Sequence, residues 1–428
     1  MFFLYLKLST ICLNFCGKYI VFIKKYIIFA FVCPVICMQD KYLKISKIIN
    51  IKIMKFVVSS SSLLFHLQAV GRVISSKNTI SILENFLFNL SGDKLTVTAS
   101  DQETTMTTSV EVQDAEGSGL FAVSAKMLLD SLKELPDQPL TFEINDDNLE
   151  IFLYFQNGKF NFVGINGSEY PQRAQLSETA KTISMGSDSL LKGINNTAFA
   201  LADNDLRPVM SGIYFDVHPD YIVFVASDSQ KLACFKNMSV QTGLQTSFIL
   251  PRKPASLLKN ILAKENGDVT ITFDEKNACF NLENFVLNCR LIEGNYPKYA
   301  SVIPQNNPSQ LIIDRSVFTT ALRRVAVFSD QASSLVKLQL SPDKLIVSAR
   351  NISFSTSAEE SVACSYTGDT MNIGFSANYL IEVLNNMSSQ EVSVQLSDPS
   401  RAGVIVPMQN EENEDMLVLL MPIMLGDF

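Results

Sequence analysis

Apolar and polar positions follow two periods along residues 54–428 of this 428-residue chain. Stretches such as KLTVTA at 94–99 and YIVFVA at 221–226 alternate or run apolar, which is typical of strands. Other stretches repeat apolar residues every three or four positions, which is typical of helices. These helical stripes occupy 63–73, 190–198 and 318–325, and then 128–135, 257–262 and 380–387. The pattern predicts an α+β fold with two helices packed on antiparallel sheets in each repeat.

Landmark residues recur in the same order in three copies. Three phenylalanines are spaced by 127 residues, namely Phe121, Phe248 and Phe375. Three alanines end matching apolar runs, namely Ala99, Ala226 and Ala349. Near the repeat ends, Tyr170-Pro171 matches Tyr296-Pro297 and then Met421-Pro422. Constant order across three copies predicts three tandem domains, at 54–178, 179–308 and 309–428.

Residues 1–53 differ from the rest in charge and composition. They hold eight Lys and one Asp, so the other residues carry 27 basic and 42 acidic side chains, a net charge of −15. Their longest uncharged stretch, Tyr26–Gln39, has 14 residues, whereas a membrane helix needs about 20. We interpret residues 1–53 as an extension that results from a start site assigned too far upstream, with the regular pattern beginning at Met54. An export or membrane signal and a disordered tail are the alternatives.

Residue types that carry chemistry are sparse. The chain has two histidines, His66 and His218, and no Cys/His spacing that suits zinc. The nearest candidates are two cysteine pairs, Cys12 with Cys16 and Cys33 with Cys37. No phosphate-binding loop, dinucleotide fingerprint or nucleophile-elbow motif occurs. We therefore predict a non-enzymatic protein without a metal or cofactor. The rivals are an exported repeat protein with a signal at 1–38 and a hydrolase with a convergent nucleophile and base.

Several strings together resemble the bacterial DNA polymerase III beta subunit, the DNA sliding clamp. They are MKF at 54–56, SDQETTM at 100–106, DLRPVMSG at 205–212, ASDSQKLA at 226–233, PRK at 251–253, LIEGNYPKY at 291–299, IGFSANY at 373–379 and MPIML at 421–425. The likeness covers residues 54–428. It implies a head-to-tail dimeric ring with helices around the hole, which encircles duplex DNA without sequence preference and acts in the cytoplasm. The implied partners are the DNA polymerase III alpha subunit, the clamp loader, other polymerases and repair proteins, and no membrane.

The resemblance also implies three sets of site residues. The family's DNA-facing basic positions correspond to Lys77, Arg207, Arg252 and Lys253. The alternative for each of them is an ordinary solvated surface. The subunit joint corresponds to Phe160 and Phe162 opposite Val327 and Phe328. The alternative there is packing inside one domain.

The third implied site is an apolar pocket for short peptide motifs of partner proteins. Its positions correspond to Arg207, Met210, Ser227, Ser229, Gln230, Lys231, Leu232, Pro297, Val302, Leu419, Met421, Pro422, Ile423, Met424 and Leu425. Methionines suit a pocket that accepts several ligands because they repack easily. One departure is that Ser229-Gln230-Lys231 stands where the family usually has Gly-His-Arg. The alternative for 419–425 is a buried strand.

Overall fold

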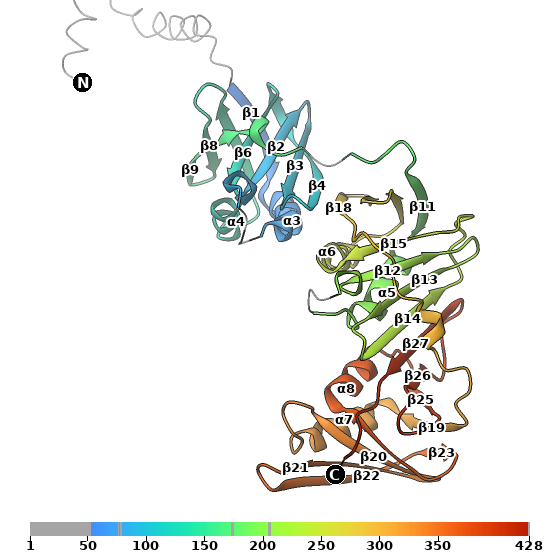
Figure 1. Ribbon diagram of the computed structural model, residues 1–428. Helices are drawn as coiled ribbons and strands as arrows, with labels where there is room; N and C mark the ends of the chain where they lie inside the picture. The colour runs from blue at the N-terminus through green and yellow to red at the C-terminus, as the bar shows by residue number, and fades with distance from the viewer. Residues whose placement is uncertain (1–52, 76, 78, 173–174, 204–206, 427–428) are drawn as a thin grey trace, which may run out of the picture.

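The computed structural model describes residues 53–75, 77, 79–172, 175–203 and 207–426. The cysteine pairs at 12–16 and 33–37 and the proposed extension up to residue 52 lie outside these residues. Three repeats follow one another in an arc, with helices on the inner side of the curve and sheets outside (Figure 1). The predicted α+β class, with two helices on antiparallel sheets in each repeat, is confirmed.

Each repeat has the same order of helices within the described residues. The first helix of each repeat is α3 (Ser60–Val70), α5 (Ser187–Ala198) or α7 (Arg315–Ala326), and the second is α4 (Ala125–Lys133), α6 (Arg252–Leu262) or α8 (Ala377–Asn385). Their apolar stripes face the sheets: in α7, for example, Phe318, Leu322 and Val325 are buried. Asp314 caps the same helix, because its Oδ1 accepts the backbone N–H groups of Ser316 and Val317, both at 2.9 Å.

The strands alternate buried and exposed side chains, as in β1, where Met54, Phe56 and Val58 are buried. The first repeat contains β1 (Ile53–Ser59), β2 (Asn85–Ser91), β3 (Lys94–Ser100), β4 (Thr104–Glu111), β5 (Gln113–Glu116), β6 (Gly119–Ser124), β7 (Pro139–Asn145), β8 (Glu150–Phe155), β9 (Gly158–Val163) and β10 (Ile165–Asn166). The second contains β11 (Lys181–Gly186), β12 (Gly212–Val217), β13 (Ile222–Ser227), β14 (Lys231–Asn237), β15 (Thr246–Pro251), β16 (Asp268–Phe273), β17 (Asn277–Asn281) and β18 (Phe285–Arg290). The third contains β19 (Ser309–Asp314), β20 (Leu335–Ser341), β21 (Lys344–Asn351), β22 (Thr356–Ala363), β23 (Ser365–Thr367), β24 (Met371–Ser376), β25 (Glu391–Leu396), β26 (Gly403–Pro407) and β27 (Glu414–Leu420).

Two sheets continue from one repeat into the next. At the first joint, β4 pairs with β18, and at the second joint, β14 pairs with β27. Each joint makes one nine-stranded sheet, in the orders β10-β6-β2-β3-β4-β18-β17-β16-β11 and β15-β12-β13-β14-β27-β26-β25-β19-β23. The two remaining sheets, β5-β1-β7-β8-β9 and β22-β21-β20-β24, end on β9 and β22. These two strands belong to the first and last repeats, at the two ends of the arc (Figure 1).

The structure corrects one of the predicted landmarks by two residues. The second helices begin directly after Ser124, Pro251 and Ser376. Phe121 and Phe248 stand three residues before these caps, so Ile373 is their counterpart and Phe375 is not. A shift of two residues keeps a strand side chain on the same face, and for this reason Phe375 is buried as well.

A second landmark, Met421-Pro422, is also wrong. After the last long strand of each repeat, the chain bonds to the edge of the other sheet in the same way. Ile165 pairs with Ala122, Ile292 N–H donates to the Ile249 carbonyl at 3.1 Å, and Ile423 pairs with Gly374. Met421 therefore occupies the position of Val163 and Arg290, two residues before these isoleucines. It does not correspond to Tyr170 or Tyr296.

Candidate peptide pocket and candidate contact surfaces

The linker between the second and third repeats covers the outer face of the second joint. Val223, Val225, Leu232, Val404 and Leu419 form a buried apolar cluster on that face. Two linker tyrosines pack on this cluster. The ring of Tyr296 stacks on Tyr214 with centroids 4.7 Å apart, and Tyr299 donates its hydroxyl to Asp216 at 2.8 Å. Burial and this hydrogen bond raise the pKa of Tyr299, so the hydroxyl stays protonated and keeps donating.

A cavity of about 240 Å³ opens where this cover ends. Its lining comes from Arg207 and the 3-10 turn Pro208–Met210, the β13–β14 turn with the start of β14, the linker, the residue before β26, and the end of β27 with Met421. The sequence-predicted residues that line it are Arg207, Met210, Ser227, Ser229, Gln230, Lys231, Leu232, Pro297, Val302, Leu419 and Met421. Sequence reasoning missed four further lining residues, namely Tyr296, Lys298, Tyr299 and Ala402. The string NYPKY at 295–299 was the signal that could have found three of them.

The structure does not bring the other four predicted pocket residues to this cavity. Pro422, Ile423, Met424 and Leu425 follow Met421 toward β24, where the Ile423 N–H donates to the Gly374 carbonyl at 2.8 Å. The side chain of Met424 is 73% exposed. These residues therefore lie along the edge of another sheet, and Met421 is the last residue of the tail that lines the cavity.

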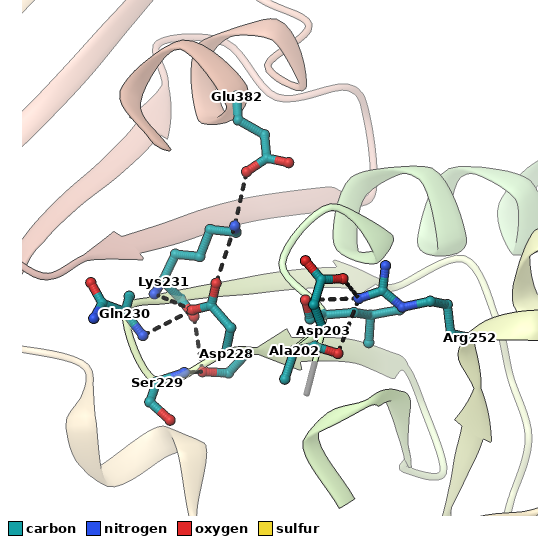
Figure 2. A network of polar contacts seen from close by, with 10 residues as sticks. Ala202, Asp203, Asp228, Ser229, Gln230, Lys231, Arg252 and Glu382 are labelled. Carbon is teal, nitrogen blue, oxygen red and sulfur yellow. Dashed lines mark hydrogen bonds and ion pairs between the residues drawn. The ribbon is translucent and has the colours of Figure 1, made fainter. Parts of the chain in front are cut away.

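The β13–β14 turn forms one wall of the cavity through a tight local network (Figure 2). Asp228 Oδ1 accepts the backbone N–H groups of Gln230 and Lys231, both at 2.8 Å. Ser229 has φ of 79°, in the left-handed region that favours glycine. The family's usual glycine at this position fits that backbone without strain, and Ser229 adopts it because Asp228 and Ser227 hold the turn.

Lys231 connects this wall to the inner helices. Its backbone belongs to β14, while its buried ammonium group reaches Asp228 Oδ2 at 3.1 Å and Glu382 Oε2 of α8 at 2.8 Å (Figure 2). It also lies 4.4 Å from the ring centre of Tyr379. Burial opposes the charge, but the bonds with Glu382 and Asp228 outweigh it and raise the pKa of Lys231. The second joint is thus closed by a charged contact as well as by strand pairing.

The four predicted DNA-facing residues lie in different surroundings. Arg207 donates to Ser229 Oγ at 2.9 Å, beside the cavity. Arg252, at the start of α6, bonds to Asp203 at 2.7 Å and to the carbonyls of Leu201 and Ala202 (Figure 2). Lys253 bonds to Asp101 and to the Val73 carbonyl, so it ties the second repeat to the first. Lys77 is exposed after the first helix.

Two of the predicted joint residues lie on the edge strand β9, and the other two follow helix α7, which packs beside the edge strand β22. Phe162, on β9, is only 6% exposed, and Phe160 packs on Phe155 with ring centres 4.7 Å apart. This is partly the packing inside one domain that the alternative expected. Val327 and Phe328 directly follow α7 and are 79% and 40% exposed. Exposed apolar residues at an open edge are typical of a surface that another molecule covers.

In the described part of the chain, no three His, Cys, Asp or Glu side chains gather as metal ligands would. None of the helices described is both long and apolar enough to span a bilayer. Burial raises the pKa of the Cys234 thiol to about 12, so this cysteine beneath the cavity is not a thiolate at neutral pH.

Comparisons with known proteins agree on one family. Residues 54–174, 184–298 and 300–424 match the family models of the N-terminal, central and C-terminal domains of the DNA polymerase III beta subunit. The chain is 27% identical over 373 residues to the beta sliding clamp of Pseudomonas aeruginosa, covering 87% of this chain and 100% of that protein. It is 26% identical over 382 residues to that of Bacillus subtilis, covering 86% and 99%. A crystal structure of the Pseudomonas aeruginosa DnaN sliding clamp bound to griselimycin matches with a TM-score of 0.82 and 26% identity, covering 87% of this chain and 100% of that one.

Replacing Lys231 with Ala should lower the free energy of unfolding by about 1–3 kcal/mol, because Asp228 and Glu382 lose the cation between them. Lys231→Arg should keep most of the stability that Lys231→Ala loses, because the cation remains. Urea unfolding at neutral pH measures the free energy of unfolding of both variants. Since the pKa of Lys231 is raised in the folded protein, its contribution is present below the ordinary value of 10.5 and is lost as the pH rises through the higher folded value. Equal stability of Lys231→Ala and the unmodified protein at pH 7 would contradict this account.

Proposed function

Because the chain belongs to the DNA polymerase III beta subunit family, the bacterial DNA sliding clamps, we propose that two copies close into a ring through the free edges β9 and β22. The chain is a DNA sliding clamp, a non-catalytic processivity factor of replication. We assign clamp domains to 54–178, 179–308 and 309–428, so that a ring of two copies contains six. The observation that supports this ring is the pairing at the two joints inside one chain.

Both intrachain joints use the same register. At the first joint Met106 pairs with Leu287, and at the second Ala233 pairs with Val418. Met106 and Ala233 are the hairpin partners of Ala99 and Ala226, and the third member of this series is Ala358, the partner of Ala349. Leu287 and Val418 stand five residues before Ile292 and Ile423, and the matching residue before Ile165 is Phe160. The same rule places Ala358 of one copy opposite Phe160 of the other.

This register makes chemical sense at the neighbouring positions. Glu359 falls opposite Lys159, and opposite charges across an antiparallel pair contribute about 0.2–1 kcal/mol. Phe160 and Phe162 turn to the same side as Ala358 and Glu360, which is the side of α7, because Glu360 bonds to Arg324 of that helix. Val327 and Phe328 end α7 on that side. Pairing would also satisfy the backbone groups that both edges leave open.

We propose that duplex DNA passes through the ring beside the helices, held by non-specific contacts to phosphates. Among the four candidates, Lys77, Arg207 and Arg252 are exposed, and Arg207 lies beside the cavity, so we assign the phosphate contacts to Lys77 and Arg252. The partner of Arg252, Asp203, is 91% exposed, and an ion pair of that kind contributes little, so a phosphate can replace it. Lys253 serves mainly the first joint through Asp101.

We further propose that the cavity at the second joint binds short apolar motifs of partner proteins. These partners are the polymerase III alpha subunit, the clamp loader, other polymerases and repair proteins, in the cytoplasm. Leu232 and Leu419 form its apolar floor, and Met210 and Met421 flank it as adaptable walls. Pro422–Leu425 lie outside the cavity and are assigned an indirect role, since the bond of Ile423 to Gly374 positions Met421.

Cysteines placed by the proposed register should join the two copies. Ser357 falls opposite Asn161, so Ser357→Cys with Asn161→Cys should form an intermolecular disulfide under mild oxidation. Ser361→Cys with Asn161→Cys is the matched control, since its positions are four residues out of register on the same face. Non-reducing gels read out both. A crosslink in the control but not in the test pair would refute the register.

Replacing Lys77 and Arg252 with Ala should weaken binding to linear duplex DNA at every sequence. It should lower the salt slope of log K by about 1 for each lost contact. Lys236→Ala is the control, because this residue lies over the Tyr221 ring on the outer sheet. Fluorescence anisotropy across salt concentrations measures the slope.

The ring itself should stay on circular DNA after loading and leave when the DNA is cut, and retention on linear DNA would count against encirclement.

Leu232→Thr with Leu419→Asn should reduce peptide affinity about 30-fold or more, because two central apolar contacts become polar. The first joint has Thr105 and Asn288 at the positions equivalent to Leu232 and Leu419. Because a threonine and an asparagine are accommodated there, the fold of the double variant should persist. The probe is a fluorescent peptide carrying the clamp-binding motif of the polymerase alpha subunit. Asn288→Ala is the control and should bind as the unmodified protein does. Unchanged affinity in the double variant would place the partners elsewhere.

A further inference from the structure

Four of the five most exposed large apolar side chains described lie near the edge strands β9 and β22. Among the large apolar residues described, those at least 70% exposed are Val163, Val327, Ile352, Phe354 and Met424. Val163 ends β9, Val327 follows α7, and Ile352 and Phe354 form the tip between β21 and β22. The tip residues are not among those that the resemblance assigned to the joint. Exposed apolar side chains concentrated at one place call for a partner surface.

This tip differs from its two counterparts. Six residues separate the pair Ala99–Met106, and six separate Ala226–Ala233, but eight separate Ala349–Ala358. The shorter tips are polar, with Asp101-Gln102-Glu103 and Asp228-Ser229-Gln230. The third tip is thus longer by two residues and carries Ile352 and Phe354 at its end.

The shorter tips show where such a tip lies when its joint is closed. At the first joint, the Arg290 N–H donates to the Glu103 carbonyl at 2.8 Å, and the tip shares a cavity with Asn277 and Asn288. At the second joint, the Met421 N–H donates to the Gln230 carbonyl at 2.8 Å, and the tip faces Ala402 and Leu419. In both, the tip lies across the end of the opposing strand and the start of the strand beside it.

The same position on a second copy carries polar and apolar side chains. Glu150 and Asn161, which bond to each other at 3.0 Å, take the places of Asn277 and Asn288. Val163 takes the place of Arg290 and Met421, and it is 79% exposed. Beside it, Leu149 takes the place of Lys276, since the Gly164 N–H donates to the Leu149 carbonyl as the Leu291 N–H donates to that of Lys276. The surface that would receive the tip therefore offers it two apolar contacts, exposed Val163 and partly buried Leu149.

We propose that Ile352 and Phe354 dock on Val163 and Leu149 of the second copy and form an additional apolar anchor of the subunit joint. This inference rests on the proposed ring. The two intrachain joints are held together by the covalent chain, whereas the joint between copies must also offset the lost translational and rotational freedom of two molecules. An apolar anchor at the joint between copies supplies that extra affinity. The two intrachain joints, whose tips are polar, have no need of such an anchor because the chain already holds them together.

Replacing Ile352 and Phe354 together with Ser tests the anchor. Loss of these contacts should raise the dimer dissociation constant about 10- to 100-fold in sedimentation equilibrium. Met408→Ser is the control, because Met408 is also exposed, at 42%, but lies just after β26. Peptide binding at the cavity should not change. An unchanged dissociation constant in the double variant would overturn the anchor.

A second measurement locates the contact. A benzophenone amino acid in place of Phe354 should crosslink to residues 149–163 of the second copy, as found by mass spectrometry. Crosslinks confined to its own chain would overturn the proposal, as would crosslinks to another protein. The Ser357→Cys with Asn161→Cys crosslink separates the two levels of inference. If this disulfide forms while the anchor tests fail, the proposed ring stands without the anchor. If the unmodified protein is monomeric and the cysteine pair does not crosslink, both the ring and the anchor are wrong.

Discussion

Unpaired backbone groups at the edges of sheets are the constraint on which this structure depends. A strand edge leaves a row of N–H and C=O groups that must find partners or face water. Four strands resolve this by pairing across repeats, in β4 with β18 and β14 with β27. The repeat leaves β9 and β22 with the same shape and no such pairing within the described chain. A curved row of three repeats with two complementary ends closes when a second copy supplies the missing pairings, and the inner helices then surround a hole.

At each closed joint, a lysine of the second repeat bonds to an acidic side chain of the neighbouring repeat. Lys253 bonds to Asp101 at the first joint, and Lys231 bonds to Glu382 at the second. At the proposed joint between copies, Lys159 and Glu359 would form an ion pair of a different kind, between the paired strands themselves. Lysines used in this way cannot all serve DNA, even though they lie near the predicted DNA-facing set. The net charge of −15 on residues 54–428 is compatible with DNA binding because accessible cations such as Lys77 and Arg252 belong to the helical side.

The sequence predicted elements and repeats better than it predicted register and tails. Apolar periodicity located the six long helices of the described residues, because burying a stripe against a sheet requires that spacing. The alignment of the repeats misplaced Phe375, because a shift of two residues leaves a strand's buried face unchanged and the alignment cannot detect it. The family resemblance placed Pro422–Leu425 in the cavity, and only the bond of Ile423 to Gly374 shows that the chain turns away. Tyr299 and Ala402 were missed because a lining made by a linker and a strand start depends on tertiary contact alone.

Comparison of the two intrachain joints explains how one architecture acquires different chemistry. The backbone pairing is the same, yet Leu232 and Leu419 at the second joint correspond to Thr105 and Asn288 at the first. The first joint also has a hollow on its outer face, beneath the linker that contains Tyr170 and Pro171, but Thr105 and Asn288 make part of its lining polar. An apolar peptide gains little there, since it would leave those polar groups without water or a partner. The same backbone pairing thus carries an apolar lining at one joint and a largely polar lining at the other, which includes Thr98, Thr107 and Asn281. The side chains on this face can therefore differ between joints without changing the pairing that joins the repeats.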